Sequence, residues 1–335
     1  MFLFMVVKVA INGFGRIGRQ VFWAGFDDPD IEWVAINDLT DTKTLAYLLK
    51  FDSVHGKFPY PVDFTENELI VNNKRIRVFS EKDPSKLPWK ELGVEIVAEC
   101  TGFFTKREGA ELHLKAGAKK VLISAPAKDP DFTVVKGVNE HLYDKEKHNI
   151  ISNASCTTNC LAPMVKVLND NFKVKRGFMT TVHAYTATQK LMDGPHKKLT
   201  RGRAAAVNIV PTTTGAAKAI GEVLPELKGK LDGFALRVPV VDGSIVYLVV
   251  EVEKETDKEK INWLFKQVSE NHLKGVLEYS EEPLVSTDII HDSHSCIVDA
   301  AYTNVVDKTL ISMAGWYDNE WGYSNRMIDI LKILL

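Results

Sequence analysis

Cys156 has the clearest potential for chemistry, because it lies in a polar stretch, residues 152–160, between two apolar segments. The short run 149–151 precedes it and the helical pattern 161–168 follows, so we expect Cys156 at a strand-to-helix turn, among residues that cap helices. Unpaired N–H groups and the helix dipole favour an anion there. A thiol in that place ionises more easily, and the thiolate attacks carbon. The alternative is a buried cysteine that only packs.

A cysteine nucleophile needs a base that works near neutral pH, and histidine is the usual choice. Of the nine histidines, His183 is best placed, on an alternating segment soon after the nucleophile's helix. The alternative is a structural histidine. Metal binding is a weaker interpretation, both for Cys156 with Cys160, which have no matching Cys/His pair nearby, and for His291 with His294, which lie in a polar loop. We therefore predict no metal site.

The N-terminal region carries a second pattern. An apolar run, residues 6–11, leads into Gly13, Gly15 and Gly18, spaced as G-x-G-x-x-G before a helical segment. The first glycine allows a tight turn, the second lets backbone approach a pyrophosphate, and the third lets the helix pack closely. Asp38 lies 38 − 18 = 20 residues further on, where an NAD site needs a carboxylate for the ribose. The alternative is a simple glycine turn with Asp38 as a helix cap.

Alternating strands and helices follow in the first half of the chain and predict a parallel sheet. Buried strands at residues 95–102 and 120–124 end in small polar residues, including Thr101 and Ser124. Ligands bind at such strand ends in open α/β sheets. We expect Cys100, just inside one of these ends, to be a packing residue.

The second half of the chain has a different pattern. Residues 234–240 and 244–252 alternate as in an antiparallel sheet with one covered face. Residues 211–220 predict a threonine-capped helix and thus a second anion site. The segment 189–204 is long, irregular and basic, which is typical of a functional or partner-bound loop. Residues 324–335 predict a closing helix.

These patterns predict an α/β protein. A Rossmann-type parallel-sheet domain spans residues 1–154 and is completed by a C-terminal helix, 319–335. An α+β catalytic domain with a mostly antiparallel sheet spans residues 155–318. The chain of 335 residues is long enough for both domains.

Composition excludes several classes of protein. A net charge of −2 gives no support for nucleic-acid or anionic-membrane binding. No run approaches the roughly 18 apolar residues of a membrane span. Four cysteines do not make a disulfide scaffold and suit a reducing cytoplasm. Residues 1–5 are apolar but lack the flanks of a signal peptide, so we expect a short extension, with Met5 as an alternative start.

Five segments of the sequence, in order and at family spacing, resemble phosphorylating, NAD-dependent glyceraldehyde-3-phosphate dehydrogenase: residues 13–19, 152–159, 211–217, 237–239 and 316–320. The resemblance runs from about Lys8 to the C-terminus. It implies that Cys156 attacks the aldehyde to give a thiohemiacetal, while His183 takes the thiol proton and steadies the oxyanion. Hydride then passes to the nicotinamide, and inorganic phosphate cleaves the thioester to 1,3-bisphosphoglycerate, a step of glycolysis and gluconeogenesis.

The resemblance also implies binding residues. Thr186 and Arg237 match the site for the substrate's phosphate. The inorganic-phosphate site is matched by Ser155, Thr157, Arg203, Thr214 and Gly215. Besides the three glycines, the NAD contacts are matched by Arg16, Ile17, Asp38, Lys82, Ser124 and Asn319, with Tyr323 near the nicotinamide. The patch Arg201-Gly202-Arg203 has fewer arginines than many relatives have, and spacing favours Arg203.

The family is a homotetramer whose long loop packs against a neighbour's cofactor site, which would account for residues 189–204. Gly194-Pro195, together with Asp38, resembles the branch that uses NAD rather than NADP. Two alternatives stay open at this point. One is an erythrose-4-phosphate dehydrogenase of the same family, and the other is a non-catalytic NAD-binding redox sensor.

Overall fold

The chain folds into two compact units, and the computed structural model describes residues 6–334. The expectation for the extension at residues 1–5 lies outside the described residues. The first unit contains described residues 6–134, 141–154 and 324–334, and the second contains 135–140 and 155–323. None of the helices in the described part of the chain is long and apolar enough to cross a membrane.

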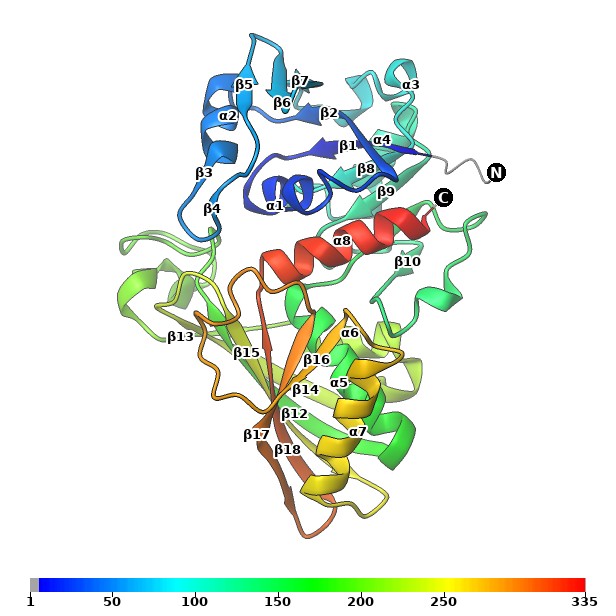
Figure 1. The fold of residues 1–335 in the computed structure, drawn as a ribbon, viewed down its shortest axis with the longest axis vertical. Coiled ribbons are helices and arrows are strands. Elements are labelled where there is room, and N and C mark those ends of the chain that lie inside the picture. The colour runs from blue at the N-terminus through cyan, green and yellow to red at the C-terminus, as the bar shows by residue number, and fades with distance from the viewer. Residues whose placement is uncertain (1–5, 335) are drawn as a thin grey trace. The chain divides into compact units, whose positions relative to one another are not determined.

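The first unit is built on a nine-stranded sheet in the order β10-β11-β9-β8-β1-β2-β7-β6-β5, drawn mostly in blue and cyan in Figure 1. The pairs from β10 to β7 are parallel, and β6 and β5 add an antiparallel edge. The strands are β1 (Val7–Asn12), β2 (Ile31–Asn37), β5 (Val62–Phe64), β6 (Glu68–Val71), β7 (Lys74–Phe79), β8 (Ile96–Glu99), β9 (Lys120–Ile123), β10 (Phe132–Thr133) and β11 (Ile150–Ser152).

β1 lies between β2 and β8, so the chain changes direction across the sheet at this point. Open α/β sheets bind ligands at the carboxyl ends of strands at such a switch point. The remaining elements of this unit are α1 (Arg16–Ala24), α2 (Thr42–Lys50), β3 (Phe51–Asp52), β4 (Gly56–Lys57), η1 (Pro84–Lys86), α3 (Trp89–Leu92) and α4 (Arg107–Lys115).

The second unit contains a seven-stranded, mostly antiparallel sheet in the order β13-β14-β12-β15-β18-β17-β16. Its strands are β12 (Val174–Ala184), β13 (Val210–Thr213), β14 (Leu231–Val238), β15 (Ser244–Val252), β16 (Leu277–Ser280), β17 (Cys296–Val306) and β18 (Leu310–Tyr317). Three helices pack against it (Figure 1): α5 (Cys156–Phe172), α6 (Ala216–Val223) and α7 (Lys258–Glu270). Short 3-10 turns are η2 (Glu140–Leu142), η3 (Leu199–Gly202), η4 (Ala205–Val207) and η5 (Pro225–Leu227). The predicted α/β fold, with one parallel and one mostly antiparallel sheet, is confirmed.

The last helix, α8 (Trp321–Ile333), begins three residues before the helix predicted at 324–335 and two residues after the start of the domain-completing segment 319–335. Its residues from Ser324 onward belong to the first unit. There Ile328 packs so closely on Gly25 that a Cβ on that glycine would lie 2.6 Å from the isoleucine's Cδ1. Lys332 pairs with Asp28 at 2.9 Å. The first unit is therefore completed by the end of the chain.

One local prediction is wrong. Residues 211–213 were expected to begin a threonine-capped helix, but they belong to β13, which pairs antiparallel with β14. β-branched threonines suit a half-buried strand. α6 begins only at Ala216, and its N-cap is Gly215, which makes no side-chain cap. Thr214 still contributes, since its hydroxyl accepts a hydrogen bond from the Ala216 N–H at 3.2 Å.

Candidate active site

Cys156 is the first residue of α5, directly after the N-cap Ser155. The Ser155 hydroxyl accepts a hydrogen bond from the Thr158 N–H at 3.0 Å, which satisfies one of the open donors of the first turn. Ala154, just before the cap, has a left-handed backbone with φ of 52°. The strand-to-helix turn expected from the sequence is present, and it places the sulfur at the positive end of a 17-residue helix.

His183, near the end of β12, lies with its Nε2 3.5 Å from the Cys156 Sγ. Its Nδ1 is 2.7 Å from the Ala184 carbonyl oxygen. A guanidinium nitrogen of Arg237 also lies 3.0 Å from Nδ1, and it donates to the same carbonyl oxygen at 2.9 Å. Since the carbonyl only accepts and makes the shorter contact with the ring, we assign the ring proton to Nδ1, which leaves the lone pair of Nε2 facing the sulfur. This tautomer can take a proton from the thiol.

The buried surroundings disfavour charge on each group taken alone. Burial raises the pKa of the Cys156 thiol, although the positive charge of Arg237 and hydrogen bonds to Thr157 lower it. Burial and the charge of Arg237 lower the pKa of His183 to about 3. The sequence led us to expect an easily ionised thiol, whereas in the structure desolvation outweighs the favourable charges. Ionisation of the sulfur therefore depends on proton transfer to its histidine partner.

Tyr317 supports this pair from β18. It lies in the segment 316–320 that carries the family resemblance, but no role was predicted for it. Its hydroxyl lies 3.0 Å from the Thr157 hydroxyl and 2.8 Å from the Thr181 hydroxyl. The phenol is buried and its ring meets the His183 ring edge-on, with centroids 5.9 Å apart. Tyr317 thus links the first turn of α5 to the strand that carries the histidine.

Cationic and hydroxyl groups gather beside His183. Arg237, paired with His183 in the register of β12 and β14, donates to the Ala184 carbonyl at 2.9 Å and lies 3.4 Å from the Thr186 hydroxyl. Thr188 bridges this group to Arg201, at 2.8 Å from Thr186 and 3.3 Å from the guanidinium. Two guanidinium groups with nearby hydroxyls can bind phosphate.

The choice between the two loop arginines comes out differently from the sequence prediction. Arg203, which spacing favoured, pairs with the exposed Asp193 at 2.9 Å and is itself 63% exposed. Arg201 donates to the Thr212 hydroxyl at 3.0 Å, and its positive charge lowers the pKa of both His183 and Arg237. The geometry therefore joins Arg201, and not Arg203, to the cationic group.

The remaining predicted residues of the second unit lie apart from these contacts. Thr214 and Gly215 precede α6. Asn319 is buried, and its side-chain oxygen accepts a hydrogen bond from the Ser244 hydroxyl. Tyr323 is buried in the first turn of α8.

The two histidines of the weaker metal interpretation have different neighbours. His294 lies 2.9 Å from a carboxylate oxygen of Asp292 and 3.2 Å from one of Glu278, whereas His291 stacks on Trp321.

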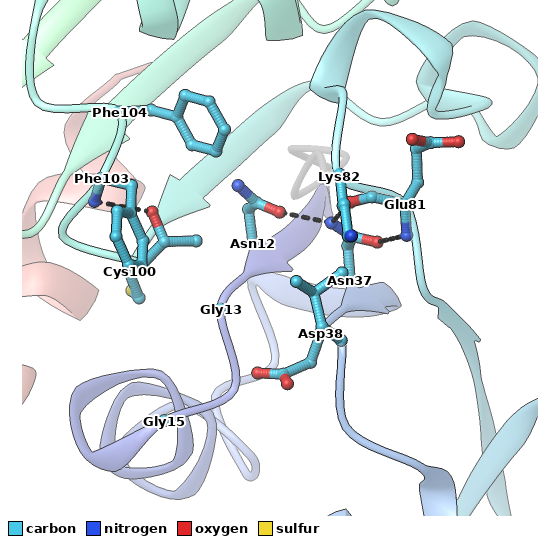
Figure 2. Close-up of a pocket in the computed structure, with 12 residues that line it drawn as sticks. Asn12, Gly13, Gly15, Asn37, Asp38, Glu81, Lys82, Cys100, Phe103 and Phe104 are labelled. Carbon is cyan, nitrogen blue, oxygen red and sulfur yellow. Dashed lines mark hydrogen bonds between the residues drawn. The ribbon is translucent and has the colours of Figure 1, made fainter.

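The first unit has a cavity of about 580 Å³ at the carboxyl ends of β1, β2 and β8 (Figure 2). Each glycine of the N-terminal pattern has a distinct role there. Gly13 has φ of 90°, and a Cβ on it would lie 2.7 Å from the Thr101 nitrogen. A Cβ on Gly18 would lie 2.1 Å from the Gly13 oxygen, so the helix packs closely. Gly15, which lines the cavity, has nothing within 4 Å of that position and leaves room for a ligand.

Two of the other predicted cofactor residues line the same cavity, and Arg16, Ile17 and Ser124 are not among its lining residues. Asp38 lines it and accepts a hydrogen bond from the Phe14 N–H at 2.7 Å, and Lys82 lines it as well. Arg16 and Ile17 open α1 after Gly15, a helix start that suits phosphate oxygens. Arg16 also pairs with Asp52 at 2.6 Å. Ser124 follows β9, with its N–H bonded to the Glu99 carbonyl at 3.0 Å.

Sequence reasoning missed several residues of the cavity lining: Asn12, Asn37, Leu39, Glu81, Cys100, Phe103 and Phe104. Asn12 and Asn37 end the buried strands β1 and β2, so a polar residue closing an apolar run was the available indication. Cys100 was expected only to pack. Burial raises the pKa of its thiol to about 12, so it remains uncharged in the lining.

Two family models match the chain. Residues 7–107 match "Glyceraldehyde 3-phosphate dehydrogenase, NAD binding domain", and residues 155–319 match "Glyceraldehyde 3-phosphate dehydrogenase, C-terminal domain". The chain is 61% identical to glyceraldehyde-3-phosphate dehydrogenase of Thermotoga maritima over 332 residues, which cover 98% of this chain and 99% of the relative. It is 58% identical to glyceraldehyde-3-phosphate dehydrogenase 1 of Bacillus subtilis over 326 residues, 97% of each chain.

The chain belongs to the glyceraldehyde-3-phosphate dehydrogenase family. The family resemblance seen in the sequence is therefore confirmed. Every residue that lines the cavity lies within the range matched by the NAD-binding model of this dehydrogenase family. The glycine cradle and the carboxylate of Asp38 also suit a dinucleotide. The predicted cofactor, NAD, is confirmed, and the cavity is the part of the domain that fits it.

Proposed function

We propose that this chain is an NAD-dependent, phosphorylating dehydrogenase that converts D-glyceraldehyde 3-phosphate to 1,3-bisphosphoglycerate in glycolysis and gluconeogenesis. The observation that carries the proposal is the 3.5 Å approach of the Cys156 sulfur to a histidine nitrogen with its lone pair toward it. The relatives' names support the substrate. Residues 1–154 with the last helix form the NAD-binding domain in this proposal, and residues 155–318 form the catalytic domain.

Cys156 adds to the aldehyde carbon as its proton moves to the His183 Nε2, and a thiohemiacetal forms on the sulfur. The imidazolium then steadies the oxyanion next to it. NAD, when bound, supplies the hydride acceptor. The resulting thioester on Cys156 is cleaved by inorganic phosphate. In this proposal the dinucleotide is held by the three glycines of the N-terminal pattern and by the other predicted cofactor contacts: Gly13, Gly15, Gly18, Arg16, Ile17, Asp38, Lys82, Ser124 and Asn319.

Two anions need binding sites in the second unit. Arg237 and Thr186 hold the phosphate of the substrate, since they are joined and lie directly beside His183. Inorganic phosphate is held by Ser155, Thr157, Thr214 and Gly215. For the arginine of that site we now favour Arg201, because it donates to Thr212, on the strand that leads directly into Thr214 and Gly215, whereas Arg203 pairs with the exposed Asp193.

The test is a steady-state assay of NADH formation with purified protein. We expect turnover with D-glyceraldehyde 3-phosphate to require inorganic phosphate or arsenate, and kcat/KM for erythrose 4-phosphate to be much lower. A higher kcat/KM for erythrose 4-phosphate would favour the alternative dehydrogenase. Bound NAD without turnover on either aldehyde would favour a redox sensor.

Replacement of Arg201 by alanine is expected to raise the KM for inorganic phosphate by about tenfold or more, because a charge-assisted contact to the anion is lost. The matched control is Arg203→Ala, which removes only an exposed ion pair with Asp193 and should leave that KM within about twofold. Phosphate titrations at saturating aldehyde and NAD compare the two variants. A larger rise in the KM for phosphate in Arg203→Ala than in Arg201→Ala would assign the site to Arg203.

We also propose a homotetramer. One face of the sheet in the second unit carries the buried side chains of Met179 and Leu248. The opposite face carries exposed aromatic side chains: Phe178, which is 71% exposed, Phe234 and Tyr247. Contiguous apolar surface of this kind favours a protein partner. Exposed Leu191, Met192 and Leu199 in the loop 189–204 suit a contact with a neighbouring copy.

The four free thiols support a cytoplasmic location.

A further inference from the structure

A chain of polar side chains is buried next to the NAD cavity of the first unit. Its members come from β1, β2, β8, α3 and α4, and none is more than 5% exposed: Asn12, Asn37, Trp89, Glu99 and His113. Buried polar groups cost free energy unless they are hydrogen-bonded, and a connected, satisfied network makes the surrounding structure rigid. The cavity-lining members of this network are therefore held in fixed positions.

The deepest part of the network joins an indole, an imidazole and a carboxylate. Trp89 donates from Nε1 to the His113 Nδ1 at 3.0 Å. Because the indole N–H only donates, Nδ1 is the acceptor and the ring proton is on Nε2. Nε2 in turn donates to the Glu99 Oε2 at 3.1 Å. His113 thus transmits the position of the core tryptophan to the carboxylate.

The Glu99 carboxylate collects four donors. Besides His113, the Asn12 side chain donates to Oε2 at 2.6 Å, and the Thr101 N–H donates to Oε1 at 2.8 Å. The Thr101 hydroxyl donates to the same Oε1 and accepts from the Phe103 N–H at 3.0 Å. Glu99 therefore fixes Asn12 and Thr101, which both line the cavity, without lining it itself.

From Asn12 the network continues along the cavity wall, as the dashed lines of Figure 2 show. Asn37 donates from Nδ2 to the Asn12 Oδ1 at 2.7 Å and to the Glu81 carbonyl at 2.9 Å. Its own oxygen accepts from the Glu81 N–H at 2.9 Å. One set of hydrogen bonds therefore sets the spacing of the ends of β1, β2 and β8 and of the segment after β7.

We propose that Glu99 and His113 are positioning residues for NAD, which hold the cavity walls in the binding geometry before the cofactor arrives. This inference rests on the assignment of the cavity to NAD. A cavity fixed in advance binds more tightly, because less ordering is left for the binding step. Loss of the His113 donor leaves Oε2 of Glu99 with one donor fewer, so the carboxylate that anchors Asn12 and Thr101 is held less firmly.

The test is equilibrium binding of NAD to the full-length protein by calorimetry. We expect His113→Leu to raise the Kd for NAD by about tenfold or more, as loss of preorganisation would. His113→Gln can still donate to Glu99 from its amide, so its Kd should stay within about threefold of the unsubstituted protein. In steady-state assays, the KM for NAD should rise in His113→Leu, while kcat at saturating NAD stays close to that of the parent.

Val121→Ala is the matched control, since it removes buried atoms from a separate core cluster of the same unit. It should lower the thermal unfolding midpoint but leave the Kd unchanged. If His113→Leu lowers the midpoint and also leaves the Kd unchanged, His113 is only structural and the inference is overturned. If His113→Leu does not fold, Trp89→Phe, which removes the N–H and keeps a ring, must raise the Kd by about threefold, and an unchanged Kd would overturn the inference. Failure of the parent protein to bind NAD would instead count against the cofactor assignment.

Discussion

Replacement of Cys156 by serine is expected to lower kcat by about four orders of magnitude or more, because the serine hydroxyl does not ionise near neutral pH and no thioester can form. The substitution is small, and the Ser155 cap on Thr158 does not involve the side chain of residue 156. Binding of NAD should therefore be unaffected. Initial rates of NADH formation, together with NAD binding by calorimetry, measure the two quantities separately.

The matched control is Cys160→Ser, one turn further along α5. Cys160 is fully buried and its thiol donates to the Gly315 carbonyl at 3.6 Å, so its role is in packing. We expect this variant to lose some thermal stability and to keep kcat within about tenfold. Wild-type turnover in Cys156→Ser, or its loss in Cys160→Ser alone, would show that a different sulfur is the nucleophile.

Replacement of His183 by asparagine is expected to slow alkylation of Cys156 by iodoacetamide at pH 7 by at least about tenfold. Lowering the pKa of His183 from 6.5 to about 3 corresponds to about 5 kcal/mol against the charged ring. A thiolate and an imidazolium 3.5 Å apart attract each other by about 5 kcal/mol at an effective dielectric constant near 20. The attraction offsets the cost of charging the imidazole, and the raised pKa of the thiol is the cost that remains, so the thiolate forms only as the proton passes to His183.

Asparagine at position 183 removes both the proton acceptor and the cation. The thiolate then lacks its partner, and burial keeps the pKa of Cys156 above 9. Since a higher pKa moves thiolate formation to higher pH, the midpoint of the alkylation curve should move upward, and slow acylation should remain. Alkylation rates between pH 5 and 10 test this, with the exposed His272→Asn as control. Coincident curves for His183→Asn and the parent would remove His183 from the role of base.

Local spacing was enough to predict the features that depend on neighbouring residues. The strand-turn-helix contexts of Cys156 and of Gly13, Gly15 and Gly18 follow from short apolar runs and capping residues. The histidine was predictable because few strand histidines were available near the nucleophile. These parts of the site are set within a few residues of sequence.

Contacts between distant segments could not be predicted. Thr181 and Tyr317 are 136 positions apart and meet only through the registers of β12, β15 and β18. That Arg201, and not Arg203, contacts Thr188 and Thr212 was not predictable, because spacing in an irregular loop does not determine which side chain turns inward. The helix expected at residues 211–213 formed a strand because pairing with β14 outweighed local preference.

The dependence of the first unit on α8 has a consequence for synthesis on the ribosome. Gly25 and Asp28 emerge early, but their contacts with Ile328 and Lys332 form only after residues about 300 positions later have been made. All nine strands of the large sheet in the first unit are made before α8, so the nascent unit carries its cofactor-binding sheet without the closing helix while the second unit is being made.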